Sequence, residues 1–85
     1  MSEQTTVLVV DDDPDIVALM RDFLEVEGYA VLTADRGDRA LDIIDEGAVG
    51  CVLLDIMMPG MSGFDAVRRI RERGDLPVLI LSARQ

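Results

Sequence analysis

The chain has 85 residues, of which 49% are hydrophobic and 29% charged, and its formal net charge at pH 7 is −9. This length predicts one small globular domain, and the hydrophobic content excludes a disordered chain. The negative charge argues against nucleic-acid binding by this segment, because neutralising phosphates requires a basic surface.

The composition also limits location and chemistry. The apolar runs are far shorter than the ~20 residues that a membrane helix needs. Residues 1–6 lack the basic and apolar segments of a secretory signal, so we expect a cytoplasmic location. Cys51 is the only cysteine, which excludes an intrachain disulfide, and we expect it to be a small buried hydrophobic residue. Without histidine, the chain has no histidine nucleophile, base or zinc ligand.

The first strand and the first helix are defined by clear local signals. Val7–Val10 is a continuous apolar run, typical of a strand that is covered on both faces. Asp13 suits the N-cap and Pro14 the first position of a helix, which Gly28 is expected to end. The predicted buried stripe of this helix is Ile16, Leu19, Met20, Phe23 and Leu24.

Strands and helices then alternate to the last residue. Strands are predicted at 29–34, 51–54 and 78–81, and helices at 37–46 and between Ser62 and Gly74. The residues expected to face inward from the two helices are Ala40, Leu41, Ile44, Phe64, Val67 and Ile70. The order βαβαβαβ predicts an α/β fold with a parallel sheet and right-handed crossovers. We expect the edge of the last strand, and apolar surface near it, to be uncovered.

Side chains with oxygen atoms follow three of the predicted strands. They are Asp11 and Asp12, Asp55, and Ser82. Ligands bind at this carboxyl edge in open α/β sheets. Two carboxylates ~5 Å apart oppose each other by about 3 kcal/mol at an effective dielectric constant near 20, and a divalent cation would offset that repulsion. Hard oxygen ligands favour Mg²⁺, so Asp11, Asp12 and Asp55 are candidate metal ligands.

Asp55 could in addition act as a nucleophile toward phosphorus, with Mg²⁺ bridging the attacking oxygen and the phosphoryl group. Simpler interpretations stay open for its neighbours. Asp11 and Asp12 could be solvated loop acids that interact with the helix dipole, and Ser82 could be a turn residue or a helix cap. Met57 could contact a metal only through its backbone carbonyl.

A basic cluster follows the third strand. It consists of Arg68, Arg69, Arg71 and Arg73. The helical pattern puts these arginines opposite the apolar face, so we expect a solvated surface and not a nucleic-acid site.

Three stretches of the sequence together resemble the receiver domain of two-component response regulators. They are Val-Val-Asp-Asp-Asp-Pro at 9–14, Leu-Leu-Asp-Ile-Met-Met-Pro-Gly-Met-Ser-Gly at 53–63 and Pro-Val-Leu-Ile-Leu-Ser-Ala at 77–83. The resemblance runs from Val7 to the last residue. It implies a flavodoxin-like three-layer sandwich with strand order 2-1-3-4-5.

The resemblance also implies a function. Asp55 would accept a phosphoryl group from a histidine kinase, and the chain would be a phosphoacceptor rather than an enzyme with a separate substrate. Mg²⁺ would be held by Asp12 and Asp55 directly, by the Met57 carbonyl, and by Asp11 through water. Ser82 would be the switch hydroxyl, and the amides of Met57 and Ala83 would donate to phosphoryl oxygens. The side chains at 57 and 84 would tune the lifetime of the phosphoryl group, and the expected output is transcription.

The chain departs from the family pattern in one region. Receivers carry a lysine at the end of a fifth strand, whereas all eight basic residues here are arginines. The fifth strand and helices 4 and 5 are also missing from the sequence. We therefore expect residues 1–85 to form an incomplete receiver domain, truncated after the fourth strand, that is marginally stable or self-associates.

Two other functions fit the same sequence. The chain could be a phosphorylation-independent interaction or dimerisation module that pairs through the exposed fourth strand. It could also be a small Mg²⁺-dependent phosphohydrolase with an aspartyl nucleophile. Against the latter, Met57 stands where a haloacid-dehalogenase-like phosphatase would place its second aspartate.

Overall fold

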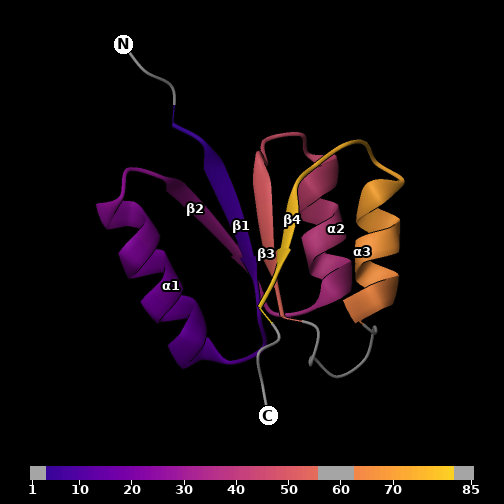
Figure 1. The fold of residues 1–85 in the computed structure, drawn as a ribbon. Helices are drawn as coiled ribbons and strands as arrows, with labels where there is room; N and C mark the ends of the chain where they lie inside the picture. Colours follow the sequence, from indigo (N-terminus) through magenta and orange to yellow (C-terminus); the bar gives the residue numbers. More distant parts are fainter. Residues whose placement is uncertain (1–3, 56–62, 82–85) are drawn as a thin grey trace.

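The computed structural model describes residues 4–55 and 63–81, which alternate between strands and helices (Figure 1). In chain order the elements are β1 (Thr6–Val10), α1 (Pro14–Val26), β2 (Ala30–Ala34), α2 (Gly37–Asp45), β3 (Cys51–Leu54), α3 (Gly63–Arg71) and β4 (Val78–Ile80). The predicted order of elements is therefore confirmed, with small differences at their ends.

The four strands form one parallel sheet in the order β2-β1-β3-β4. The central strand β1 pairs with both neighbours in a register that sets Val10 beside Ala34 and Leu54. These three residues are the last of their strands, so β1, β2 and β3 end at the same level. The order equals the first four strands of the flavodoxin-like order that the sequence predicts.

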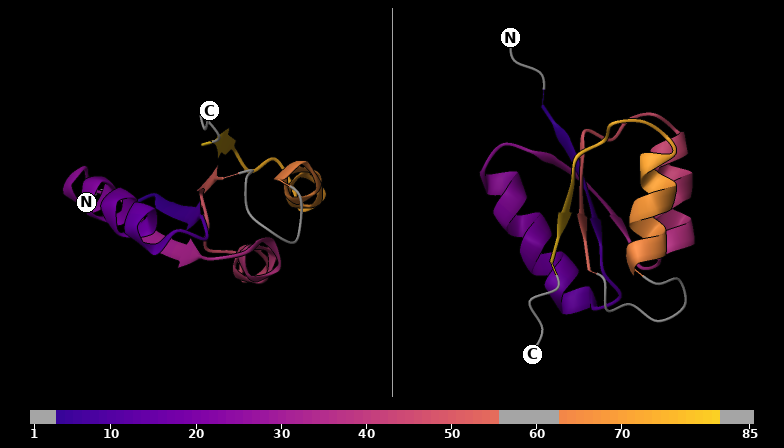
Figure 2. Two further views of the ribbon diagram at one scale, coloured as in Figure 1. Left: turned by 90° about the horizontal axis from the view of Figure 1, so that it is seen from below. Right: turned by 45° about the vertical axis from the view of Figure 1, so that its right-hand side comes forward.

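Helices cover both faces of the sheet, with α1 on one side and α2 and α3 on the other (Figures 1 and 2). Successive side chains of a strand point to opposite faces, so β1 contributes to two cores. Leu8 and Val10 pack with the residues of α2 and α3, and Val7 and Val9 pack on the α1 side. Cys51 is half-buried beside the α1-side cluster. The fold is thus the predicted three-layer sandwich.

Local signals start α1 where the sequence predicts. The side chain of Asp13 accepts a hydrogen bond of 2.9 Å from the Asp15 backbone N–H, and Pro14 is the first helical residue. After the helix, Gly28 has a φ of +99°, which glycine adopts without the strain of a Cβ atom. Both ends of α1 therefore follow from residue types alone.

The predicted buried stripe of α1 is only partly right. Met20 and Leu24 pack against the core together with Val17, whereas Leu19 and Phe23 are 64% and 61% exposed. Ile16 is also exposed. The helix carries two apolar stripes about 100° apart, one with Val17, Met20 and Leu24 and the other with Ile16, Leu19 and Phe23. Only the first stripe faces the sheet.

The prediction for α3 contains a second error. Phe64 was expected to face inward but is 76% exposed, whereas Ala66 and Ile70 are buried and Val67 packs at the margin of the core. The small residues Gly63 and Ala66 take the inner face at the start of the helix. For α2 the prediction is confirmed, since Ala40, Leu41 and Ile44 are all buried, and Ile43 is buried with them.

The arginines of and after α3 are exposed, as predicted. Arg68 pairs with Asp65 on the same helix. Arg73 donates to Asp45 at the end of α2 over 2.7 Å, which connects the ends of the two helices. These contacts describe a solvated surface stabilised by ion pairs.

Apolar side chains are also exposed on β4. Leu79 and Ile80 are 58% and 46% exposed, which confirms the expectation of uncovered apolar surface around this strand. Within the described ranges, every helix is too short or too polar to cross a lipid bilayer.

Candidate functional site

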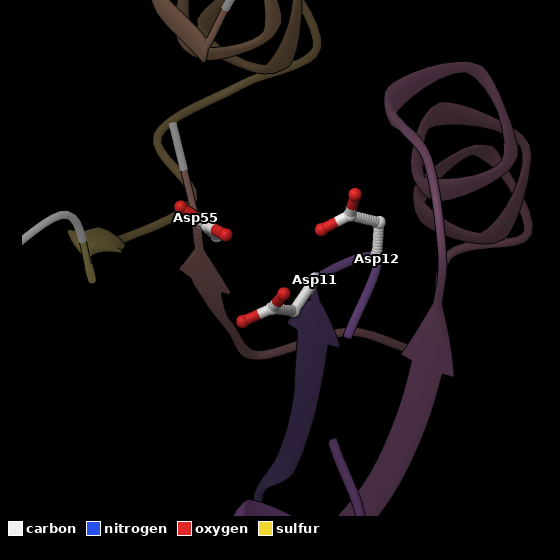
Figure 3. A group of neighbouring side chains, drawn as sticks. All are labelled: Asp11, Asp12 and Asp55. Atoms are coloured by element: carbon white, nitrogen blue, oxygen red, sulfur yellow. The ribbon is translucent and has the colours of Figure 1, made fainter. Parts of the chain in front are cut away.

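The ends of β1 and β3 bring three aspartates to one edge of the sheet (Figure 3). Asp11 and Asp12 follow β1, and Asp55 follows β3. The sheet hydrogen bonds continue past the strands: the Asp55 N–H donates to the Val10 carbonyl over 3.0 Å, and the Asp11 N–H donates to the Ala34 carbonyl over 3.1 Å. The backbone at Asp11 and Asp55 is therefore held by the sheet.

The three carboxylates, here called the acid cluster, face a common space. One oxygen of each lies within 4.8 Å of the others. In Figure 3 the Asp12 carboxylate is turned toward Asp55, with Asp11 between and below them. Because a Mg–O bond is about 2.1 Å, two ligands of one ion stand at most about 4.2 Å apart, so small side-chain rotations suffice for a shared ion. The donor type and the spacing both fit a hard divalent cation.

Burial and charge together act on Asp11. Asp11 is only 5% exposed, so it is not a solvated loop acid, whereas Asp12 is exposed and Asp55 half-buried. Burial raises the pKa of Asp11, and so do the negative charges of Asp55 and Asp12 and a side-chain hydrogen bond with Asp55. The Asp13 N–H, which donates to Asp11 Oδ1 over 3.0 Å, lowers the same pKa. The net raised pKa means that the Asp11 carboxyl group is harder to ionise than a solvated one, first because it is buried and then because of the neighbouring negative charges.

The acid cluster thus contains the three aspartates that the sequence singled out. Met57, Ser82 and Ala83 lie outside the described residues, so the roles expected for them stay predictions. The residue before Ser82 is described: the Leu81 N–H donates to the Leu54 carbonyl over 2.7 Å. The backbone immediately before Ser82 therefore lies beside the backbone immediately before Asp55.

The Asp13 backbone N–H is a contributor that the sequence did not reveal. Asp13 was expected to cap α1, and it does so through its side chain. Its own N–H also orients the Asp11 carboxylate. An aspartate two residues before a helix cap is a local signal that could have suggested this turn.

Comparisons with known proteins agree on one family. The family model of the response regulator receiver domain matches residues 7–85. The transcriptional regulatory protein CpxR of Escherichia coli (strain K12) is 40% identical over 78 residues, an alignment that covers 92% of this chain and 33% of CpxR. The transcriptional regulatory protein ResD of Bacillus subtilis (strain 168) is 41% identical over 83 residues, covering 98% of this chain and 35% of ResD. The chain spans about a third of the length of these relatives.

A solved structure has the same fold. The response regulator protein TrrA of Thermotoga maritima, in complex with Mg²⁺ and BeF, aligns with a TM-score of 0.90 at 38% sequence identity. The alignment covers 96% of this chain and 72% of the TrrA chain. TrrA in complex with the histidine kinase ThkA gives a TM-score of 0.89.

Proposed function

Since this chain belongs to the response regulator receiver family, we propose that Asp55 accepts a phosphoryl group from a histidine kinase at a Mg²⁺ site formed by the acid cluster. The observation that carries the proposal is the convergence of three carboxylates, from two adjacent strand ends, within 4.8 Å. Asp55 is half-buried at the end of β3, where its backbone is held by β1. A carboxylate in this position can meet a donor that approaches the sheet edge from solvent.

The proposed cation ligands are Asp12 and Asp55 directly, Asp11 through water, and the backbone carbonyl of Met57. Three carboxylate oxygens within 4.8 Å of one another, and the negative charges of Asp55 and Asp12 beside Asp11, support a cation at this cluster. When bound, Mg²⁺ would neutralise charge at the site and polarise a phosphoryl oxygen. The Mg²⁺–BeF complex of TrrA, at 38% identity to this chain, is consistent with the same cation here.

The proposed transfer needs one nucleophile and several donors. A carboxylate oxygen of Asp55 attacks phosphorus and forms the new P–O bond, while the P–N bond of the phosphohistidine donor breaks and the imidazole nitrogen keeps its electron pair. The Ser82 hydroxyl and the amides of Met57 and Ala83 are the proposed hydrogen-bond donors to the phosphoryl oxygens. The bond from Leu81 to Leu54 supports the place of Ser82, because it aligns the chain before Ser82 with the chain before Asp55.

The partner and the output follow from the relatives and remain proposals. TrrA was solved with the histidine kinase ThkA, and CpxR and ResD are named transcriptional regulatory proteins. We infer a histidine kinase as phosphodonor and transcription as the output of the whole protein. Residues 1–85 are assigned to a single receiver domain, and the chain covers 72% of the TrrA chain. A cytoplasmic location stays a prediction from the sequence.

Intact mass spectrometry tests the proposal directly. After incubation with acetyl phosphate and Mg²⁺, the chain should gain one phosphoryl group, and Asp55→Asn should gain none. Asp42→Asn is the matched control, because Asp42 is an exposed aspartate of α2 and the substitution removes the same charge. Absence of any added mass in a folded chain that binds Mg²⁺ would contradict phosphoacceptance by this chain.

Self-association is a second proposed property, favoured by the exposed apolar residues of β4. Leu79 is 58% exposed on a strand at the edge of the described sheet, a position that can pair with a second copy of the chain. Sedimentation velocity should show a dimer that Leu79→Glu weakens. Val26→Glu, at an 84% exposed position of α1, should leave it unchanged. A monomer at all concentrations would exclude this second property.

A further inference from the structure

An open surface cavity of about 530 Å³ lies between α1 and the carboxyl half of β2. These two elements run side by side at one edge of the sheet (Figure 1). Pro14, Val17 and Ala18 of α1 form an apolar wall, and Thr33 and Ala34 form the β2 side. We call this the β2 cavity. Its volume is large enough for a small ligand, one side of which would stay exposed to solvent.

Two arginines from different helices line the β2 cavity. They are Arg21, near the middle of α1, and Arg39, in the first turn of α2. Among residues 4–55 and 63–81, ion pairs join Arg36, Arg68 and Arg73 to carboxylates, and neither Arg21 nor Arg39 has such a partner. In a chain of net charge −9, one cavity is thus lined by two guanidinium groups that form no ion pair within the described part of the chain.

The β2 cavity borders the acid cluster, because Asp11 and Asp12 also contribute to its lining. With Asp35, the lining has three formal negative charges against two positive ones, a net charge of −1. A divalent cation at the acid cluster changes this sum to +1. Anion binding in the cavity should therefore be weak without the cation and strengthened by it.

We propose that the β2 cavity binds a small organic phosphate, whose phosphate group lies against Arg21 and Arg39 and whose apolar body lies against Pro14, Val17 and Ala18. Guanidinium groups bind phosphate through paired N–H donors. Two arginines therefore favour a phosphate group as the bound anion. The ligand is distinct from the phosphoryl group proposed for Asp55, because Asp55 does not line the cavity.

Coupling between the β2 cavity and the Mg²⁺ site would let a ligand in the cavity change the affinity of the receiver for Mg²⁺. Binding is reciprocal, so if Mg²⁺ strengthens binding of the organic phosphate, the phosphate strengthens binding of Mg²⁺ by the same factor. This coupling rests on the Mg²⁺ site proposed above, whereas the cavity and its arginines do not.

Phenyl phosphate is a suitable probe, titrated into the ¹⁵N-labelled full chain with and without Mg²⁺. We expect amide shifts to concentrate on Val17–Arg21 and Thr33–Asp35, and Mg²⁺ to lower the dissociation constant at least fivefold. Arg21→Gln and Arg39→Gln should each raise the dissociation constant about tenfold or more, because each removes a charged donor pair. Inorganic phosphate should bind more weakly than phenyl phosphate, since it lacks a body for the apolar wall.

Arg71→Gln is the matched control, because Arg71 is an exposed arginine of α3 that does not line the cavity. Unchanged affinity in both cavity variants, or an equal loss in Arg71→Gln, would overturn the proposal. So would shifts centred on Leu54 and Asp55, which would place the ligand at the phosphoacceptor.

The shifts of Asp11–Asp13 on addition of Mg²⁺ alone separate the two proposals. If Mg²⁺ shifts these amides but phenyl phosphate does not bind, either with or without Mg²⁺, the cavity proposal fails and the metal site stands. If Mg²⁺ shifts nothing, the metal site fails, and phenyl phosphate affinity that still depends on Arg21 and Arg39 supports the cavity without its coupling.

Discussion

Replacing Asp11 by asparagine should stabilise the metal-free protein. Asp11 is 5% exposed and shares a 4.8 Å cluster with Asp12 and Asp55. At an effective dielectric constant of 20, two charges at that distance repel by roughly 3.5 kcal/mol. Asp12 is exposed and Asp55 half-buried, so solvent screens a large part of this repulsion. We expect Asp11→Asn to increase the free energy of unfolding by about 1–2 kcal/mol, or a Tm increase of about 4–15 °C.

Asp11→Asn isolates the effect of the negative charge at residue 11. Asparagine keeps the size of the side chain and an oxygen that can accept the Asp13 N–H, which now donates over 3.0 Å. Urea denaturation in EDTA at pH 7 measures the effect, with Asp42→Asn as the control for the loss of one exposed negative charge. In saturating Mg²⁺ the difference in stability between Asp11→Asn and the wild type should shrink or reverse, because the bound cation stabilises the native wild type.

The pH dependence has a defined sign. Because the pKa of Asp11 is raised in the folded state, the fold binds that proton more tightly than the unfolded chain does. The stability of the metal-free wild type should therefore fall as pH rises from the ordinary value of 3.8 through the raised pKa, and this fall should be absent in Asp11→Asn. A variant that is no more stable than wild type in EDTA would refute the reasoning that the cluster is held against its own repulsion.

Four further substitutions test the packing and the helix ends, each by urea denaturation. Ile70→Ala should lower the free energy of unfolding by about 2–5 kcal/mol, because Ile70 is 1% exposed. Phe64→Ala, at a 76% exposed site, should change it by less than about 1 kcal/mol. A larger loss for Phe64→Ala than for Ile70→Ala would contradict the observed inner face of α3. Asp13→Ala should cost about 1 kcal/mol through loss of the α1 cap, and a neutral result would mean that the Asp15 N–H finds another acceptor. Arg73→Gln should leave the stability nearly unchanged, since its pair with Asp45 is solvated, and a marked loss of stability would reveal a larger role in joining α2 to α3.

Much of the fold could be predicted because its signals are local. The apolar run Val7–Val10 and the capping pair Asp13 and Pro14 act through their own backbone, so β1 and the start of α1 follow from residue type. The acid cluster was predictable for a related reason. Asp11 and Asp55 each follow an apolar strand, and parallel strands that are neighbours end at one edge of the sheet.

Other features were beyond local reasoning because they depend on which surfaces meet. α1 offers two apolar stripes of similar quality, and only its position on the sheet selects Val17 and leaves Phe23 exposed. Phe64 has the right spacing for the inner face of α3, but Ala66 and Ile70 take the contact with α2 and the sheet. Hydrophobic periodicity reports that a helix has an apolar side, and it cannot rank two adjacent sides.

Residue types and their spacing were enough to predict the alternation of strands and helices, the parallel sheet and the three aspartates at its carboxyl edge. Three features emerged only from the packing of the helices on the sheet: which apolar stripe of α1 is buried, the burial of Asp11 beside the exposed Asp12, and the cavity lined by Arg21 and Arg39. The first group follows from the conformational preferences of neighbouring residues and from the geometry of parallel strands. The second depends on contacts between segments far apart in the chain, which arise when the helices pack on the sheet.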